Sequence, residues 1–152
     1  MESNCWLDLS GKCLYDVPIG YYGYIYKISV IKHKSIPKEL WGKCYIGKKA
    51  FTHATKKKVS KKVIKETKTR QRVVRSTKDS GWLQYFGSSK ELLEDIKTYG
   101  KEYFKREIIC FCKSKAELTY FEAYWQFMER VLLIDSYNKW ISCKVYKHLL
   151  NK

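Results

Sequence analysis

Residues 22–30 read Tyr-Gly-Tyr-Ile-Tyr-Lys-Ile-Ser-Val, and residues 43–47 read Lys-Cys-Tyr-Ile-Gly. In the first stretch, aromatic and β-branched side chains recur at every second position, which is the period of a β-strand. The second stretch is a return strand that ends at Gly47, and residues 31–40, which contain Pro37, predict the loop between the two. Together the two stretches predict a hairpin that carries several tyrosine phenols.

Two capping boxes predict helices farther along the chain. Ser88-Ser89-Lys90-Glu91 predicts a helix capped by Ser88 that continues to about Tyr99 and stops at Gly100. Ser114-Lys115-Ala116-Glu117 opens a longer helix over roughly 115–133, whose apolar residues are spaced three and four apart.

Residues 104–112 alternate and predict a third strand between the two helices. Phe104, Arg106, Ile108, Cys110 and Cys112 would share one face. The strand is apolar on both faces toward its end, which is typical of a central strand. Residues 1–20 have a mixed composition and predict an irregular arm, and the tail from Trp140 to Leu150 predicts a short strand and a helical end.

The length of 152 residues fits one domain, which we place at 21–152 after the arm. The chain holds 31 Lys and Arg against 15 Asp and Glu, a net charge of +16. Such a charge favours a polyanion as partner. Residues 56–78 carry eleven of the basic residues and a single acidic one, Glu66, so a basic insertion at 48–80 holds most of the excess.

Two interpretations of this insertion are compatible. The first is a solvated, mobile loop. The second is a flexible arm that follows phosphates and gains affinity from counterion release without reading sequence. Both hold if the loop becomes ordered only when nucleic acid binds.

Several classes of protein are disfavoured by the sequence. No apolar run approaches the roughly 18 residues that would span a bilayer. Residues 1–4 lack the basic start and apolar run of a signal peptide, so we expect a cytoplasmic protein, in a host cell if a phage encodes it. The six cysteines show no C-x2-C spacing and the three histidines are scattered, which predicts ordinary thiols rather than structural zinc.

The order of elements is strand, loop, strand, basic insertion, helix, strand, long helix with a glutamate, then an asparagine. With Ile25-Tyr26 and Tyr45-Ile46-Gly47 in the first two strands, the chain resembles the GIY-YIG nuclease superfamily over roughly residues 22–140, most of all its small phage-borne members. The resemblance implies an α/β fold of α+β type, with a small three-stranded, mainly antiparallel sheet flanked by helices. It also implies metal-dependent hydrolysis of a DNA phosphodiester.

The resemblance also suggests the site residues. The two motif tyrosines fall on Tyr26 and Tyr45, the metal-binding glutamate on Glu122 and the asparagine after its helix on Asn138. The arginine of the family is assigned to Arg72, with Arg75 and Arg70 as alternatives, and its histidine-or-tyrosine partner to Tyr85.

The sequence departs from the family pattern in three places. Tyr24 occupies the motif glycine position, residues 27–44 make an unusually long spacer, and the insertion falls where the arginine-bearing helix would begin. Tyr85-Phe86-Gly87 is therefore a rival for the second motif. Tyr45 is preferred because residues 43–47 make the better strand.

These residue types suit phosphodiester hydrolysis. A single Mg²⁺ (or Mn²⁺) keeps several waters and often takes only one or two protein carboxylates, so Glu122 alone could hold it. Nearby Lys and Arg would lower the pKa of a phenol, and Tyr26 or Tyr45 could then accept a proton from water. Arg72 would stabilise the charge that develops on the phosphoryl group. Contacts to double-stranded DNA are predicted at Lys48, Lys49, Lys56, Lys57, Lys58, Arg70 and Arg75.

Other interpretations of these residues remain open. Tyrosines in strands are most often cross-strand packing pairs. Glu122 and Glu129 lie equally at the edge of the helix's apolar arc, and Asn138 could be a turn residue. The rival function is a non-catalytic nucleic-acid-binding protein or an inactivated nuclease relative. Because the chain has no separate recognition domain, we expect low sequence specificity, or specificity gained through a homo-oligomer.

Overall fold

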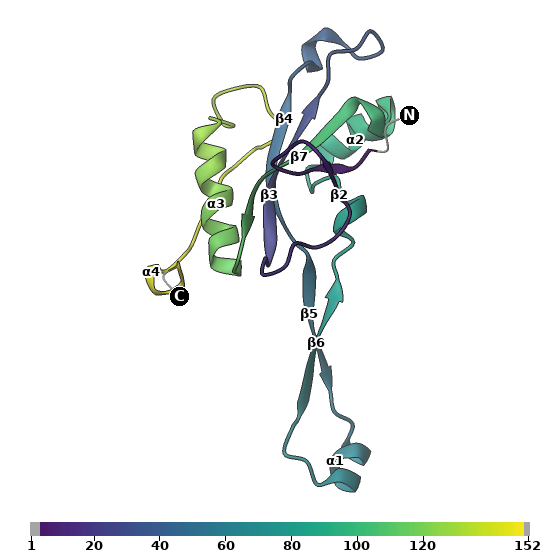
Figure 1. Cartoon of the computed structure of the whole chain (residues 1–152), viewed down its shortest axis with the longest axis vertical. Helices are drawn as coiled ribbons and strands as arrows, with labels where there is room; N and C mark the ends of the chain where they lie inside the picture. Colours follow the sequence, from purple (N-terminus) through teal and green to yellow (C-terminus); the bar gives the residue numbers. More distant parts are fainter. Residues whose placement is uncertain (1–3, 151–152) are drawn as a thin grey trace.

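The computed structural model describes residues 4–150 and centres on a five-stranded sheet with helices on both faces (Figure 1). The strand order is β2-β1-β7-β3-β4, in which β1 and β7 run parallel and the other pairs are antiparallel. The three predicted strands are present and lie side by side in the order β7-β3-β4. The prediction of a three-stranded sheet is wrong, because the sheet also contains β1 and β2. The strands are β1 (Trp6–Leu7), β2 (Cys13–Leu14), β3 (Gly23–Val30), β4 (Cys44–Ala50) and β7 (Phe104–Cys112).

The two additional strands come from the segment that was expected to be an irregular arm. β1 and β2 have two residues each, too short to show a period in the sequence. Trp6 is fully buried, and its indole N–H donates to the carbonyl of Trp82 at 2.8 Å. Cys5 and Cys13 form a disulfide across this pair of strands, so the prediction of ordinary thiols is wrong for these two cysteines.

Serine side chains cap the N-termini of the two longest helices. The Ser89 hydroxyl accepts from the Leu92 amide at the start of α2 (Lys90–Tyr99), one residue later than the predicted cap at Ser88. Ser114 caps α3 (Lys115–Met128) as predicted, although α3 ends before residue 133. The tail contributes α4 (Lys147–Leu150) and no strand among its described residues. Short 3-10 turns are η1 (Lys38–Leu40), η2 (Trp82–Gln84) and η3 (Lys101–Tyr103).

The sheet separates two apolar layers, and β3 contributes to both. Tyr24 and Tyr26 pack on the face covered by α2 and η2, whereas Ile25 packs with Ile46 and Leu118 on the face covered by α3. This alternation follows from the period of two along a strand. It places the two motif tyrosines and the glutamate-bearing helix on opposite faces of the sheet.

A β-bulge in β7 overturns one predicted face. The register with β3 shifts between Ile25 and Tyr26, which leaves Ile109 as the additional residue. Cys110 and Cys112 therefore pack on the α3 face, while Ile108 packs on the other face with Phe104. One inserted residue reverses the alternation, so the predicted single face from Phe104 to Cys112 is wrong.

The basic insertion is a two-stranded ribbon that projects from the sheet (Figure 1). It consists of β5 (Thr52–Lys58), the short helix α1 (Lys61–Thr67) and β6 (Val73–Asp79). The prediction of a loop is wrong here, because polar and basic residues on both faces hide the strand period. Within residues 4–150, no helix is long and apolar enough to cross a membrane.

Candidate active site

The two motif tyrosines lie over a glycine that leaves room for them. Tyr26 is opposite Gly47 across β3 and β4, and its ring centroid lies 6.1 Å from that of Tyr45. A Cβ on Gly47 would lie 2.5 Å from Tyr26 Oη and 2.9 Å from Tyr45 Cε1. Such distances are far below ordinary contact, so only glycine allows both rings to occupy this face. The structure thus gives the Tyr-Ile-Gly string a steric basis.

Burial controls the protonation of these phenols. Tyr26 is 1% exposed, and burial raises its pKa well above the ordinary value, with the neighbouring phenols of Tyr85 and Tyr45 adding to the effect. Burial also raises the pKa of Tyr45, against an opposing hydrogen bond with Ser88. The expectation that basic neighbours lower these pKa values is wrong for the protein alone, because burial is the main cause for both phenols and the opposing effects on Tyr45 come from hydrogen bonds with Ser88 and Tyr26.

The predicted rival motif lies next to Tyr45. Residues 85–87 form no strand; they follow η2, and the Tyr85 ring is 5.9 Å from Tyr26. Gly87 adopts a left-handed φ of +88°, and a Cβ there would lie 3.2 Å from Tyr45 Cε1. Tyr45 Oη is 3.0 Å from the Ser88 hydroxyl. Tyr45-Ile46-Gly47 is in strand β4, as predicted. Residues 85–87 pack beside the Tyr45 ring.

Glu122 reaches the same strand from the opposite side of the sheet. It projects from α3, is 17% exposed and forms an ion pair with Lys48 of β4, with 2.9 Å between Nζ and Oε2. Lys48 Nζ also lies 3.3 Å from the Thr119 hydroxyl. Glu129, which the sequence could not separate from Glu122, pairs instead with Lys27 at 2.8 Å. Packing of α3 therefore distinguishes the two carboxylates.

One open pocket of about 740 Å³ joins these groups around the outer edge of β4. Tyr45 enters it from the α2 face, whereas Lys48 and Glu122 enter from the α3 face. Tyr26 does not line this pocket and lies behind Tyr45. The remaining lining includes Ser88, Ser89, Lys90, Glu91, Thr119, Gln126, Tyr137, Asn138, Lys139, Trp140, Ser142 and Lys144.

Asn138 is bound to the edge strand that carries Tyr45. The Ile46 amide donates to Asn138 Oδ1 at 2.9 Å, and Asn138 Nδ2 donates to the Ile46 carbonyl at 2.8 Å. Gln126 Nε2 donates to the same carbonyl at 3.0 Å. Both polar atoms of the Asn138 amide are therefore engaged with the backbone of β4, which makes Asn138 a positioning residue in this structure.

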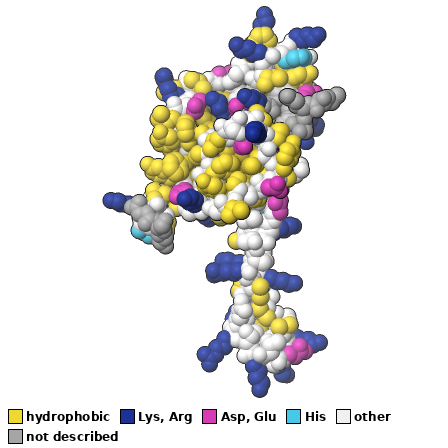
Figure 2. Space-filling view, viewed as in Figure 1, with side chains coloured by type: hydrophobic (Ala, Val, Ile, Leu, Met, Phe, Trp, Pro, Cys, Tyr) yellow, Lys and Arg dark blue, Asp and Glu magenta, His cyan; other side chains and the backbone are white. Residues whose placement is uncertain are grey.

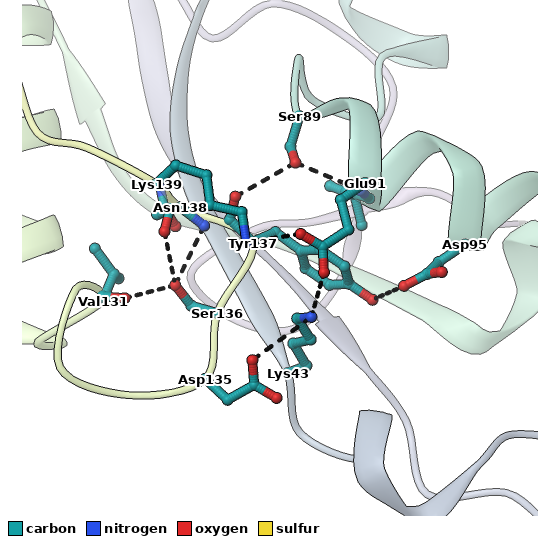
Figure 3. A network of polar contacts seen from close by, with 11 residues as sticks. Lys43, Ser89, Glu91, Asp95, Val131, Asp135, Ser136, Tyr137, Asn138 and Lys139 are labelled. Carbon is teal, nitrogen blue, oxygen red and sulfur yellow. Dashed lines mark hydrogen bonds and ion pairs between the residues drawn. The ribbon is translucent and has the colours of Figure 1, made fainter.

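A polar network fastens the segment after α3 to α2 (Figure 3). Lys43 is nearly buried and binds Glu91 at 2.5 Å, while Lys139 binds the other Glu91 oxygen at 2.7 Å. These two hydrogen-bonded cations lower the pKa of Glu91. The Tyr137 hydroxyl donates to Asp95 at 2.7 Å. The network holds Asn138 and the far wall of the pocket in place.

The donor set of the pocket is compatible with a sparsely bound hard cation. Glu122 supplies one carboxylate beside the Thr119 hydroxyl, in a pocket large enough for bound waters. Within residues 4–150, no three His, Cys, Asp or Glu side chains gather into a metal-binding group. Mg²⁺ tolerates such sites because it retains water ligands, so a lone carboxylate fits a magnesium-type ion better than zinc.

The structure does not bring the predicted arginines to the pocket. Arg72 and Arg70 lie between α1 and β6 at the outer end of the ribbon, and Arg75 lies in β6. Lysines line the pocket instead. Of the predicted DNA contacts, Lys48 is in the pocket, Lys49 lies 4.2 Å above the Tyr85 ring, and Lys56, Lys57 and Lys58 lie in β5.

A buried arginine that sequence reasoning left among the strand residues positions Tyr85. Arg106 is 3% exposed, and its Nη1 donates to the carbonyls of Leu83 and Tyr85, each at 2.9 Å. Burial lowers its pKa to about 10. Its guanidinium lies 4.2 Å from the Phe86 ring centroid. An arginine on the buried face of a predicted central strand was the available signal.

Comparison with known proteins gives one match. The model of the family described as "Putative endonuclease segE, GIY-YIG domain" matches residues 6–141, which is most of the chain. Neither the curated proteins nor the solved structures include a match.

Proposed function

The chain belongs to the GIY-YIG nuclease superfamily, in its segE-like branch, and from this we propose that it is a divalent-metal-dependent endonuclease that hydrolyses phosphodiester bonds of double-stranded DNA. Membership supports the coarser statement, an endonuclease domain with DNA as substrate. One observation carries the finer proposal: a motif tyrosine, a carboxylate and a lysine meet in a single pocket at the edge of β4.

Glu122 is the proposed metal ligand. A divalent cation bound there would neutralise charge on the phosphoryl oxygens and assist the leaving oxygen. Lys48 already forms an ion pair with this carboxylate, so its ammonium group lies where a phosphate would approach. We assign phosphate contact and charge stabilisation to Lys48 and Lys90, since Arg72 lies in the ribbon and both lysines line the pocket.

Tyr45 is the proposed general base, because it is the motif phenol that lines the pocket. Its pKa is raised by burial, so little phenolate exists at neutral pH. Proton acceptance from water by Tyr45 therefore becomes more effective as pH rises. Tyr26, packed behind it, holds the Tyr45 ring against Gly47, and Tyr85 and Asn138 act as positioning residues rather than in contact with DNA.

A binding protein without catalysis is the second candidate. The Lys48–Glu122 ion pair favours it, because the pair satisfies the carboxylate without a metal. In that case the positive charge would still bind DNA, but no bond would be cut.

Plasmid cleavage in Mg²⁺, Mn²⁺ and EDTA tests the proposal. We expect the wild type to cut in either metal and not in EDTA, and Glu122→Gln to cut at least about 100-fold more slowly. Glu129→Gln is the matched control, because Glu129 directly follows α3 and pairs with Lys27 outside the pocket; it should cut within a few-fold of wild type.

Two outcomes would decide against the proposal. Undiminished, metal-dependent cutting by Glu122→Gln would refute the site assignment. Tight DNA binding by the wild type without cutting in either metal would favour the binding protein.

A further inference from the structure

The β5–β6 ribbon has no packed face. Six of the seven residues of β6 are exposed, as are five of the seven in β5, and neither strand contains a buried residue. Figure 2 shows basic side chains projecting from the ribbon in several directions. An isolated two-stranded hairpin is at best marginally stable in water. Both faces of the ribbon are therefore open to a binding partner along its length.

Its cross-strand pairs indicate the charge of that partner. Lys56 lies directly opposite Arg75, and Lys78 lies farther along β6. Like charges directly opposite each other destabilise a ladder, and an anion between them would reverse that cost. At the outer end, α1 and the turn after it add further basic side chains: Lys61, Lys62, Lys65, Lys68, Arg70 and Arg72.

Between these charges lies a pair of hydroxyl groups that can exchange hydrogen bonds with neutral groups. Thr55 and Ser76 are opposite each other, with 2.6 Å between their hydroxyl oxygens. Hydroxyl groups both donate and accept, and they can contact any base edge, whereas an arginine such as Arg75 binds the O6 and N7 acceptors of guanine in two-point fashion. The ribbon thus carries groups suited to bases as well as to phosphates.

The base of the ribbon is fixed to the catalytic sheet. Phe51 is the single residue between β4 and β5, and it is 1% exposed. Its ring packs against Tyr24 and Trp82, and the ring centroids are 5.1 Å apart in each pair. On the returning strand, the Ser80 amide donates to the Phe51 carbonyl at 3.0 Å, and its hydroxyl donates to the Ala50 carbonyl at 2.6 Å. The ribbon therefore leaves the pocket strand from a defined position.

We propose that the β5–β6 ribbon lies in the major groove of duplex DNA and reads base edges there, giving the nuclease a built-in sequence preference; this rests on the proposed function for the cutting but not for the binding. The major groove, about 12 Å wide, admits a two-stranded ribbon as it stands, whereas the minor groove, about 6 Å wide, would have to be widened to take one. The sequence led us to expect low specificity, or specificity gained through a homo-oligomer, whereas the ribbon would supply specificity within one chain.

The fixed root sets where the recognised bases lie relative to the cut. Along an extended chain, which rises about 3.3 Å per residue, Lys56 lies no more than about 36 Å from Tyr45. Because base pairs are spaced about 3.4 Å apart, this corresponds to roughly one helical turn. Recognised bases should therefore fall within about one turn of the cleaved bond.

The test measures binding in EDTA, so it does not depend on cleavage. Thirty-base-pair duplexes are selected by the wild type from a random pool and resynthesised with 7-deazaguanine, which removes the N7 acceptor from the major groove and leaves the minor groove unchanged. We expect a sequence preference from the pool, and a loss of affinity of at least about fivefold on 7-deaza substitution. The Arg75→Ala variant should bind more weakly and respond less to the substitution.

The control removes charge away from the ribbon, two lysines against the single arginine of Arg75→Ala. Lys34→Gln with Lys38→Gln removes two exposed lysines from the loop between β3 and β4, so this double variant should keep the full response to 7-deazaguanine. A pool without sequence preference, an unaltered affinity for 7-deaza duplexes, or displacement by a minor-groove competitor alone would each overturn the proposal. Selective binding without cutting would uphold the ribbon's role while the proposed nuclease activity failed.

Discussion

β4 and β5 are consecutive stretches of one chain, divided by Phe51, yet their surroundings are opposite. Along β4 the edge carbonyl and amide of Ile46 are bound by Asn138 and Gln126, and the Lys48 side chain is paired with Glu122. Along β5 the side chains face solvent on both sides of the ribbon. The polar groups of β4 are thus paired within the protein, whereas the basic side chains of β5 remain available to bind another molecule.

The same contrast holds for cations. Lys43 is nearly buried between Glu91 and Asp135, at 2.5 and 3.5 Å. In the ribbon, Lys62 and Glu66 are 4.0 Å apart and both largely exposed, an arrangement worth little in water. Charge near the pocket therefore orders the protein itself, while charge on the ribbon is available to phosphates.

The largest effect that would sharpen this comparison is expected from Tyr45→Phe. If Tyr45 is the general base, removing its hydroxyl should slow cleavage by about 100-fold. Because burial raises the Tyr45 pKa, the wild-type rate should rise with pH through the neutral and mildly alkaline range, as the phenolate fraction grows. Single-turnover rates between pH 6.5 and 9.5 measure both effects.

Two controls make this prediction specific. Tyr120→Phe changes an exposed phenol on α3 and should leave rate and slope unaltered. If the slope persisted in Tyr45→Phe but disappeared in Tyr26→Phe, the proton acceptor would be Tyr26 instead.

Gly47→Ala should give the largest loss of stability. The added methyl would collide with Tyr26 Oη and the Tyr45 ring, and overpacking of this kind costs about 1–3 kcal/mol in free energy of unfolding. Urea unfolding followed by tyrosine and tryptophan fluorescence measures it. The ribbon counterpart, Thr77→Ala, alters an exposed residue and should stay within about 0.5 kcal/mol. Equal losses in the two variants would erase the contrast between β4 and the ribbon.

Asn138→Ala should lower stability and activity together. It leaves the buried amide and carbonyl of Ile46 with fewer partners, at a cost of about 1–2 kcal/mol. Chemical denaturation and cleavage rates of the same preparation test this. Full stability with lost cleavage would instead assign Asn138 a direct contact with DNA or the reacting groups.

The smallest stability effect is expected in the ribbon. Lys56→Gln with Arg75→Gln removes a like-charge pair, so the free energy of unfolding should rise by a few tenths of a kcal/mol at most. The salt dependence of DNA binding should weaken, with the slope of log K against log salt reduced by about 1, because Lys56 is the phosphate contact of the pair and Arg75 contacts a base. Lys34→Gln with Lys38→Gln is the charge-matched control. An unchanged slope in the ribbon variant would show that the ribbon does not contact phosphates.

Much of the fold was accessible from local patterns. The alternation of residues 22–30 and 104–112 located two strands, and Ser114 located the start of α3, because period and capping act over a few neighbouring residues. Two-residue strands and a bulge at Ile109 left no such pattern. The insertion was misjudged as a loop because its strands bury nothing, so hydrophobic alternation had no reason to exist there.

The sequence by itself determined two central strands, the start of α3 and the excess of positive charge. Tertiary structure decided which of Glu122 and Glu129 enters the pocket, that Asn138 binds Ile46, and that Arg72 lies in the ribbon. The reason is physical. Periodicity reports which way a side chain faces within its own strand or helix, whereas a site at the edge of β4 depends on how α3 and the segment after it pack against that strand.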